Sequence, residues 1–289
     1  MPRSITVLDP GPLTTVQDRG RPGWAHLGVP RSGALDGPAL DLANRLVGND
    51  ASAAGLETTL GGATVRVWAG VSAGVTVAVT GAEAEVFVDD RPACWGEPVS
   101  LRAGQTLRVG PARSGLRSYL AFAGGIDVPQ ILGSRATDTL SGTGPAPLSV
   151  GDELPVGVSD NLPQGADVVV PRTKGSPVTL RCTLGPRDDW FTADAVASLT
   201  GSTYAVSSKS NRIGLRLEGP DLNRRDRHEM QSEGIVLGAV QVPASGEPLV
   251  FLHDHPTTGG YPVIAVVHPD DLACCAQLRP GDGVRFRVI

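Results

Sequence analysis

The 289-residue sequence is poor in aromatic side chains and has no surplus of positive charge. Phenylalanine, tryptophan and tyrosine make up only 4% of the chain, and 25 basic against 30 acidic side chains give a formal net charge of −5. Proteins that bind nucleic acid or anionic membranes through their overall charge carry a basic surplus. The composition therefore excludes a broad electrostatic attraction to either, and we expect no nucleic-acid partner and no membrane partner.

Long hydrophobic runs are also lacking. No stretch approaches the roughly 18 consecutive apolar residues of a membrane-spanning helix, and the N-terminal residues MPRSITVLDPGPLTT lack the apolar segment of a signal peptide. The four cysteines show no CxxC spacing. We therefore expect a cytoplasmic protein whose thiols are reduced.

Several catalytic motifs are absent from the sequence. It contains no P-loop (GxxxxGK[ST]), no GxGxxG between a strand and a helix, no GxSxG and no HExxH. These absences argue against a self-contained NTPase, dehydrogenase, serine hydrolase or zinc protease. There is also no Met-Lys-Met-type site for the attachment of biotin, so any nucleotide or biotin chemistry is expected to use groups from another chain.

Glycine and proline are abundant, with 37 and 24 residues, which indicates many turns. Between the turns, apolar and polar residues alternate over 75–80, 178–184 and 284–288, and this period of two predicts half-buried strands. Two nearly continuous apolar runs within 249–267 flank a glycine and proline turn and are typical of buried central strands. The sequence thus predicts a mostly β fold with few short helices.

The helix with the clearest boundaries follows Asp36, which can cap the first amides. It has Pro38 in its first turn and Gly48 at its end. Two shorter helices are expected over 192–199 and 270–278, the second capped by one of its first two aspartates.

The polar segment Ser159–Ser176 is the best candidate for a domain boundary, because strand-like alternation stops before it and resumes at Val178. We therefore predict two β-rich halves. Residues 1–170 would form the N-terminal half, with a polar, glycine-rich loop and one helix, and residues 171–289 would form the C-terminal half.

Polar side chains concentrate among glycines near the N-terminus, in GPLTTVQDRGRPGWAHLGVPRSGALDGPAL. Glycines let a backbone approach a ligand closely. The side chains here that could bind a carboxylate or phosphate are Thr14, Thr15, Gln17, Asp18, Arg19, Ser32 and Asp36. The alternative is a long ordered loop whose polar groups satisfy its own backbone, with Asp36 as a helix cap.

A second polar segment, HDHPTTGGYP from His253 to Pro262, lies between the two apolar runs. Imidazole and carboxylate are common metal ligands, but alternation along a strand would put Asp254 on the face opposite to His253 and His255. No further ligand stands at a recognisable spacing. We therefore expect no metal site.

The segment SSKSNRIG, Ser207 to Gly214, combines hydroxyls, an amide and two cations. Arg212 could hold a carboxylate through two hydrogen bonds, and Lys209 could hold a phosphate or bicarbonate. The alternative is a solvated turn. Further along the chain, the segment Gln231 to Pro243 adds Ser232, Glu233 and Gln241. Glu233 could act as a general base if it is buried, although an exposed glutamate near a turn is the simpler interpretation.

Seven blocks of sequence occur in order over residues 14 to about 268: TTVQDRGRPGW, SGALDGPALDLANRLVGND, GLETTLGG, YLAFAGGID, VSSKSNRIGLRL, SEGIVLGAVQVP and TTGGYPVIA. Together they resemble the allophanate hydrolase subunit 2 or KipA family. This family includes the C subunit of the prokaryotic ATP-dependent 5-oxoprolinase and half of the carboxyltransferase domain of urea carboxylase.

The resemblance implies a cyclophilin-like β-barrel fold, in the C-terminal half in particular, and a hetero-oligomer. The implied partners are a KipI-like (allophanate hydrolase subunit 1) protein and a LamB/YcsF-like subunit. In the 5-oxoprolinase, ATP cleavage drives the opening of the lactam of 5-oxo-L-proline to L-glutamate, so ATP with Mg is expected at the level of the complex.

The resemblance also suggests site residues. Those matched for catalysis are Arg19, Arg212 and Asp254, with the two arginines neutralising developing charge. Those matched for binding a small anionic substrate or phosphoryl group are Gln17, Asp18, Ser208, Asn211, Thr257, Thr258 and Tyr261. Where many relatives have glutamine before TTGGYP, this chain has Pro256, which removes a side-chain amide and an N–H.

Three functions follow from the resemblance, and the sequence leaves all three open. The first is a subunit of ATP-dependent 5-oxoprolinase, inactive alone. The second is a component of a biotin-dependent carboxyltransferase that acts on a urea-like or amide acceptor. The third is a non-enzymatic, KipA-like antagonist of a KipI-like kinase inhibitor. We see no serine and lysine signature of an amidase.

Overall fold

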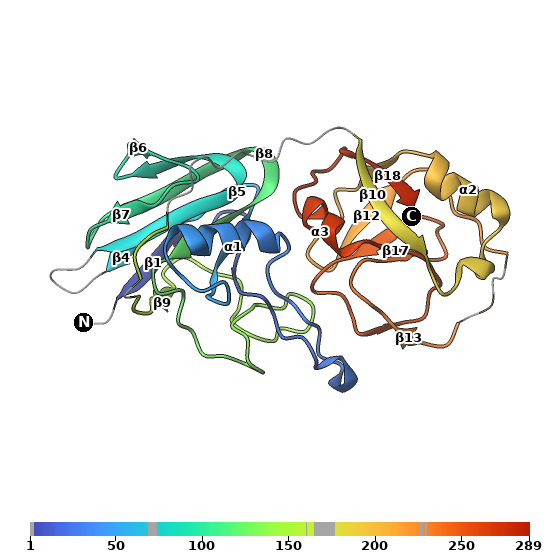
Figure 1. Cartoon of the computed structure of the whole chain (residues 1–289), viewed down its shortest axis with the longest axis horizontal. Helices are drawn as coiled ribbons and strands as arrows, with labels where there is room; N and C mark the ends of the chain where they lie inside the picture. Colours follow the sequence, from blue (N-terminus) through green and yellow to red (C-terminus); the bar gives the residue numbers. More distant parts are fainter. Residues whose placement is uncertain (1–2, 69–73, 160, 165–176, 226–227, 229) are drawn as a thin grey trace. The chain divides into compact units, whose positions relative to one another are not determined.

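The computed structural model describes residues 3–68, 74–159, 161–164, 177–225, 228 and 230–289. These residues form eighteen β-strands and three short α-helices (Figure 1), which confirms the mostly β fold. The chain divides into two compact units. The N-terminal unit comprises residues 1–21, 32–138 and 142–173, and the C-terminal unit comprises residues 22–31, 139–141 and 174–289. Within the boundary segment expected at 159–176, residues 160 and 165–176 lie outside the described residues.

The N-terminal unit is built on one nine-stranded sheet in which all pairings are antiparallel. Six strands follow the order β2-β3-β8-β4-β1-β9, and β5 pairs with β6, β7 and β8. The nine strands are β1 (Ser4–Asp9), β2 (Thr14–Gln17), β3 (Gly55–Thr59), β4 (Thr64–Trp68), β5 (Val75–Val88), β6 (Arg91–Ala93), β7 (Val99–Leu101), β8 (Thr106–Phe122) and β9 (Glu153–Pro155).

Helix α1 (Gly37–Leu46) covers one face of this sheet, over β5 and β8 (Figure 1). The capping prediction is confirmed, because the Asp36 carboxylate accepts a hydrogen bond from the Ala39 amide at 3.1 Å. Val47 ends the helix, and Gly48 follows in the left-handed region with φ of 79°. Ala43 and Leu46 pack against Ala78 and Ala121 of the sheet.

Strand β5 is more buried than its alternation predicts. Val75, Val77 and Val79 are buried as expected, but Ala78 and Thr80 on the other face are buried as well. Helix α1 is the cause, because it covers that second face, and the Thr80 hydroxyl donates to the Ala39 carbonyl at 2.7 Å. The prediction of a half-buried strand is therefore wrong at these two positions.

The C-terminal unit contains a closed seven-stranded barrel in the order β10-β17-β14-β15-β12-β11-β18. The two apolar runs within 249–267 supply β15 and β17, which confirms them as central strands. A separate two-stranded ribbon pairs β13 with β16. These nine strands are β10 (Val178–Leu184), β11 (Tyr204–Val206), β12 (Gly214–Glu218), β13 (Glu233–Gly234), β14 (Ala239–Gln241), β15 (Leu249–Phe251), β16 (Thr258–Gly259), β17 (Val263–Val267) and β18 (Gly283–Val288).

The remaining helices belong to the C-terminal unit. They are the α-helices α2 (Ala193–Gly201) and α3 (Pro269–Cys275) and the 3-10 turns η1 (Ala25–Leu27) and η2 (Asp188–Trp190). Thr192 caps α2 through its hydroxyl. The predicted aspartate cap of α3 is wrong, because the helix begins one residue earlier, with Pro269 in its first turn and His268 as its cap. Both aspartates lie within the first turn instead.

Asp271, in that first turn, forms an ion pair with Arg181 of β10, with 2.7 Å between Oδ1 and Nη2. The hydrogen bonds from Arg181 lower the pKa of the Asp271 carboxyl. A carboxyl whose native pKa lies below its unfolded value stabilises the fold above the unfolded value, and this stabilisation is lost as the pH falls through the native pKa.

The free energy of unfolding of Asp271→Asn should therefore fall below that of the wild type by a constant amount from about pH 7 to about pH 5. This difference should shrink below about pH 4, the usual range of an unfolded aspartate. Urea unfolding at a series of pH values measures it. A difference that persists unchanged to about pH 2 would show that the ion pair is not its source.

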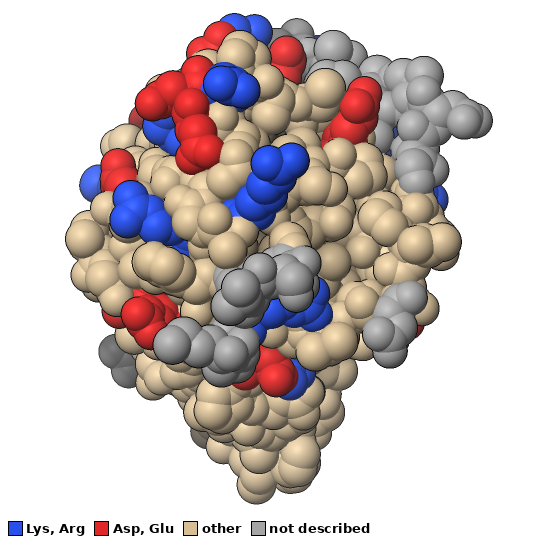
Figure 2. All heavy atoms as spheres, turned by 90° about the vertical axis from the view of Figure 1, so that its left-hand side faces the viewer, with Lys and Arg blue, Asp and Glu red and all other residues tan. Residues whose placement is uncertain are grey.

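Charges of both signs are interspersed on the molecular face shown in Figure 2, where basic and acidic side chains lie close together. Among the described residues, no helix is long and apolar enough to cross a membrane.

Candidate functional site

Arg212 and Asp254 form a fully buried ion pair in the C-terminal unit. Their side chains are 1% and 0% exposed. Arg212 Nε donates to Asp254 Oδ2 at 2.9 Å and Nη2 donates to Oδ1 at 2.9 Å, so the planar guanidinium meets the carboxylate along one edge. The alternation of apolar and polar residues does not predict this contact, because the two partners are 42 residues apart in the sequence.

Asp254 also binds Thr139, which belongs to the short segment 139–141 of the C-terminal unit. The amide and the hydroxyl of Thr139 both donate to Oδ2, at 3.0 and 2.7 Å. A carboxylate that accepts this many charge-assisted bonds is rigidly held. The same edge of Arg212 could hold a substrate anion only by displacing Asp254, so a direct role for Arg212 in substrate binding stays a prediction.

The turn before Arg212 is organised by Asn211, whose side-chain oxygen accepts from the amides of Ile213 at 2.9 Å and Gly214 at 3.2 Å. Such an Asx turn gives the backbone a fixed path. Asn211 and Ser208 are both exposed. Their predicted contact with substrate remains a prediction, and Asn211 has a clear structural role in addition.

The TTGGYP segment forms one side of the β13–β16 ribbon. Thr258 pairs with Gly234, and the Thr257 carbonyl accepts from the Ile235 amide at 2.9 Å. The sequence blocks SEGIVLGAVQVP and TTGGYPVIA therefore lie side by side. Thr257 is half-buried and Thr258 is exposed, so both hydroxyls lie near the surface.

Tyr261 follows the ribbon and is 46% exposed. Its carbonyl accepts from Gln241 Nε2 at 2.9 Å, and the Arg224 guanidinium lies 5.4 Å from the centre of its ring. This distance is within the range of a cation–π interaction. Gln241 was among the polar residues considered from the sequence, but its contact with Tyr261 was not predicted. Arg224 was not predicted at all, because its place beside Tyr261 depends on a contact made after folding.

Glu233 of the ribbon pairs with Arg187, whose Nε donates to it at 3.1 Å. The hydrogen bonds from Arg187 lower the pKa of the Glu233 carboxyl. A general base works best with a pKa near the operating pH. The arrangement therefore disfavours Glu233 as a base.

His255 is buried, and its Nδ1 lies 2.7 Å from the Pro256 carbonyl, to which it donates. The neighbouring Asp254 carboxylate is directed to Arg212 and Thr139. Within the described residues, no group of three His, Cys, Asp or Glu side chains could hold a metal ion.

Gln17, Asp18 and Arg19 lie in the N-terminal unit, whereas the other seven predicted site residues lie in the C-terminal unit. Gln17 is fully buried, and its Nε2 donates to the Thr15 hydroxyl and to the Thr137 carbonyl, each at 3.0 Å. These bonds fix the Gln17 side chain between Thr15 and Thr137.

Asp18 is 5% exposed, and its carboxylate accepts three hydrogen bonds from described residues. The donors are the Gly20 amide at 2.7 Å, the Ser134 hydroxyl at 2.6 Å and the Arg135 amide at 2.7 Å. Of these donors, the Gly20 amide belongs to the same segment, whereas Ser134 and Arg135 lie 116 and 117 residues further along the chain. Asp18 therefore has a structural role, but most of its donors come from a distant segment and not from the backbone of its own.

Arg19 lies at the surface and pairs with Asp41 of α1, with side chains 60% and 37% exposed. Nε donates to Oδ1 at 3.2 Å and Nη2 donates to Oδ2 at 2.8 Å. Arg19 and Arg212 were predicted to have the same role, but the structure gives them very different environments. Arg212 is buried, and Arg19 is exposed to solvent.

A buried polar network in the N-terminal unit was missed by the sequence analysis. Glu57 is 2% exposed, and its Oε2 accepts from the Leu35 amide and from the Tyr119 hydroxyl, each at 2.9 Å. Tyr119 in turn accepts from the Asp36 amide at 2.7 Å, and Arg117 Nε lies 3.5 Å from Glu57 Oε1. Burial, and then the charge of Glu57, raise the pKa of the Tyr119 hydroxyl well above its usual value, so it stays a donor.

A second missed cluster surrounds Arg21, which is 1% exposed. Its Nη1 donates to the Ser32 hydroxyl at 2.9 Å, and Ser32 donates to Asp138 at 2.7 Å. Ser32 has φ of 52°, a conformation that is uncommon outside glycine. The only sequence signal for either cluster was the presence of these residues in blocks rich in glycine and polar side chains.

Comparison with known proteins gives concordant matches over nearly the whole chain. The sequence profile described as "Carboxyltransferase domain, subdomain A and B" matches residues 27–288. The 5-oxoprolinase C subunit of Escherichia coli K12 is 40% identical over 289 residues, which cover 98% of this chain and 90% of that protein. The urea amidolyase of Lachancea kluyveri is 33% identical over 312 residues, which cover 99% of this chain and 17% of that protein.

Among solved structures, the urea amidolyase of K. lactis matches with a TM-score of 0.92 and 31% identity, covering 100% of this chain and 19% of that chain. The chain therefore spans most of the bacterial protein and less than a fifth of either urea amidolyase.

Proposed function

Because this chain belongs to the family of carboxyltransferase domains with subdomains A and B, we propose that it is the C subunit of an ATP-dependent 5-oxoprolinase. The observation that carries the proposal is the 40% identity to the E. coli protein, extending over 98% of this chain and 90% of that protein. The urea amidolyases contain the same domain as a small part of a much longer chain. This chain matches 90% of the length of the E. coli protein.

In this proposal the chain acts within a hetero-oligomer and is inactive alone. Its partners are a KipI-like protein and a LamB/YcsF-like subunit, and the reaction opens the lactam of 5-oxoproline to glutamate. ATP with Mg supplies the energy by activating the lactam carbonyl, a poor electrophile. We assign no step of ATP cleavage to the residues of this chain.

The residues of this chain would bind and orient the substrate. Thr257, Thr258 and Tyr261 lie near the surface at the β13–β16 ribbon, where their hydroxyls can meet a small polar molecule. The buried pair of Arg212 and Asp254 would hold the chain in place just before this segment, since Asp254 lies three residues before Thr257. Preorganised polar groups of this kind stabilise developing charge better than mobile ones.

A second candidate function is a component of a biotin-dependent carboxyltransferase. The family description and the TM-score of 0.92 to a urea amidolyase support it. In that case carboxybiotin, carried by another chain, would deliver a carboxyl group to a urea-like acceptor.

One experiment separates the two candidates. The chain is purified with its KipI-like and LamB/YcsF-like partners, and two assays are run on the same preparation. The first measures ADP and glutamate released from 5-oxoproline and ATP, and the second measures carboxyl transfer from carboxybiotin to urea. We expect ADP and glutamate in equal amounts and no carboxyl transfer. Carboxyl transfer without glutamate release would reject the 5-oxoprolinase proposal in favour of the second candidate.

A further inference from the structure

Residues 131–134 of the N-terminal unit form a tight hairpin turn between β8 and β9. The Ile131 amide donates to the Ser134 carbonyl at 2.8 Å, and the Ser134 amide donates to the Ile131 carbonyl at 3.2 Å. Leu132 and Gly133, between them, have φ of 53° and 80°. Positive φ at both central positions is the mark of a type I′ turn, for which Asn-Gly and Gly-Gly are favoured pairs. Leucine is therefore an unusual residue at the first of these positions.

The side chains of this turn are apolar and exposed. Ile131 is 43% exposed and Leu132 is 38% exposed. All five residues from 129 to 133, with the sequence PQILG, are exposed and none carries a charge, and we call these five residues the apolar tip. Single apolar residues on a surface are ordinary, but here two are adjacent and one has a strained backbone. The buried core of a protein–protein interface is likewise apolar and poor in charge.

Hydrogen bonds to buried side chains hold the base of the apolar tip. The Ser134 hydroxyl and the Arg135 amide both donate to the Asp18 carboxylate, at 2.6 and 2.7 Å. Buried Arg21 donates through Nε to the Ile131 carbonyl at 3.3 Å. The apolar tip therefore has a fixed backbone before any partner binds, and a preorganised segment loses little conformational entropy on association.

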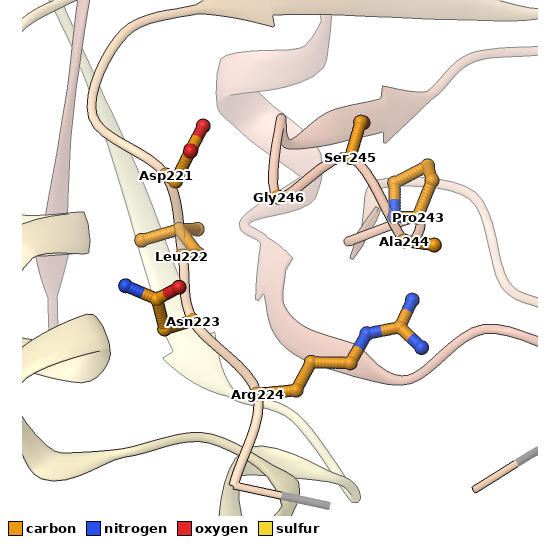
Figure 3. A pocket seen from close by; sticks show the side chains of 8 residues that line it. All are labelled: Asp221, Leu222, Asn223, Arg224, Pro243, Ala244, Ser245 and Gly246. Carbon is orange, nitrogen blue, oxygen red and sulfur yellow. The ribbon is translucent and has the colours of Figure 1, made fainter. Parts of the chain in front are cut away.

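The C-terminal unit has a cavity, but this cavity does not suit the apolar tip of a second copy of the chain. It has a volume of about 420 Å³ and lies between residues 221–224 and 243–246 (Figure 3). Figure 3 shows the Asp221 carboxylate, the Asn223 amide and the Arg224 guanidinium along it. An apolar side chain there would remove water from these polar groups without replacing its hydrogen bonds, which is unfavourable. The apolar tip therefore calls for an apolar pocket on a different protein.

We infer that the apolar tip inserts into an apolar pocket of the KipI-like subunit, with Ile131 and Leu132 as the side chains that become buried. The choice of this partner rests on the proposed function. Two relatives support a partner that is itself a folded protein. The matching E. coli protein is one subunit of an enzyme. In the L. kluyveri urea amidolyase the matched part is 17% of the chain, so there the same domain is joined to further protein.

Isothermal titration of the full-length chain with the purified KipI-like subunit tests this inference. Leu132→Asn removes the apolar side chain and introduces a residue that tolerates positive φ. We expect it to weaken binding about tenfold or more, the usual effect of losing one buried leucine. Its melting temperature should equal or exceed that of the wild type, because the backbone strain is relieved. Ile131→Thr, which keeps the branched shape but adds a hydroxyl, should also weaken binding.

Leu60→Asn is the matched control. Leu60 also belongs to the N-terminal unit, is 46% exposed and has φ of 64°. It follows the end of β3 that pairs with Thr14, at the start of β2, whereas Asp18, which holds the apolar tip, follows the other end of β2. Leu60→Asn should preserve or raise the melting temperature as Leu132→Asn does, and it should leave the affinity for the KipI-like subunit unchanged.

The inference is wrong if the KipI-like subunit fails to bind the wild-type chain, if it binds Leu132→Asn as tightly as the wild type, or if Leu60→Asn weakens binding equally. It is also wrong if sedimentation shows that the wild-type chain alone is a dimer and Leu132→Asn a monomer, because a second copy would then cover the apolar tip. Failure of the proposed function gives a different result, a complex that assembles but releases no glutamate from 5-oxoproline.

Discussion

Replacing Arg212 with alanine should lower the free energy of unfolding by about 3–5 kcal/mol, the usual cost of removing one partner of a buried ion pair. Among the described residues, the substitution leaves the Asp254 carboxylate, whose side chain is 0% exposed, with the two donors of Thr139. The structure thus adds a structural role for Arg212 to the role at the substrate that the sequence predicted. Urea unfolding followed by circular dichroism measures the difference.

Arg19→Ala is the matched control for this prediction. Arg19 also pairs with an aspartate through two hydrogen bonds, but its side chain is 60% exposed. Exposed ion pairs contribute about 0–1 kcal/mol, so Arg19→Ala should change the free energy of unfolding by no more than this. Equal losses in the two variants would mean that burial does not decide the effect, and the structural role assigned to Arg212 would be wrong.

Replacing Glu57 with alanine should have a similarly large effect in the N-terminal unit, about 3–5 kcal/mol. The carboxylate is an acceptor for the Leu35 amide and the Tyr119 hydroxyl, and it lies 3.5 Å from the buried Arg117. The substitution removes the carboxylate that pairs with Arg117. It also removes the hydrogen-bond acceptor of the Leu35 amide, just before α1. The polar segment that leads into this helix should therefore lose order, which amide hydrogen exchange at Leu35 and Asp36 would detect.

Tyr119→Phe distinguishes the contribution of the hydrogen-bond network to the free energy of unfolding from the contribution of packing. It retains the ring, which is fully buried, and removes only the hydroxyl that accepts from the Asp36 amide. The expected cost is about 1–3 kcal/mol, that of one unsatisfied buried donor. If Tyr119→Phe cost as much as Glu57→Ala, or if Glu57→Ala cost less than about 1 kcal/mol, the charged network would not be what holds this segment.

The sequence predicted those parts of the fold whose signals are local. Helix α1 has its cap, its proline and its terminal glycine between Asp36 and Gly48, and all three have the predicted positions. Strand β10 alternates as expected at its centre, with Leu180 and Cys182 buried and Thr179 exposed. Such patterns depend on one element at a time, so they can be recognised without the fold.

The parts that could not be predicted depend on contacts between distant residues. Thr80 looks like a solvent-facing strand residue until α1 covers it. Glu57 and Tyr119 are 62 residues apart, and Arg212 and Asp254 are 42 apart. A single sequence shows which residues can form ion pairs and hydrogen bonds, but burial and pairing arise only when strands meet. This explains why the predicted Arg19 and Arg212 turn out to have opposite environments.

The proposed function assigns this chain an essential place in a reaction that it does not perform alone. Activation of the lactam by ATP would then belong to the assembled complex.

The most direct test of this account is to measure the release of glutamate and ADP from 5-oxoproline and ATP by the reconstituted complex, with this chain omitted and then added back. We predict that both products appear together, in equal amounts, only when this chain is present with its partners. Glutamate release at the full rate without this chain, or by this chain alone, would contradict the proposal that it is an essential but not self-sufficient subunit of a 5-oxoprolinase.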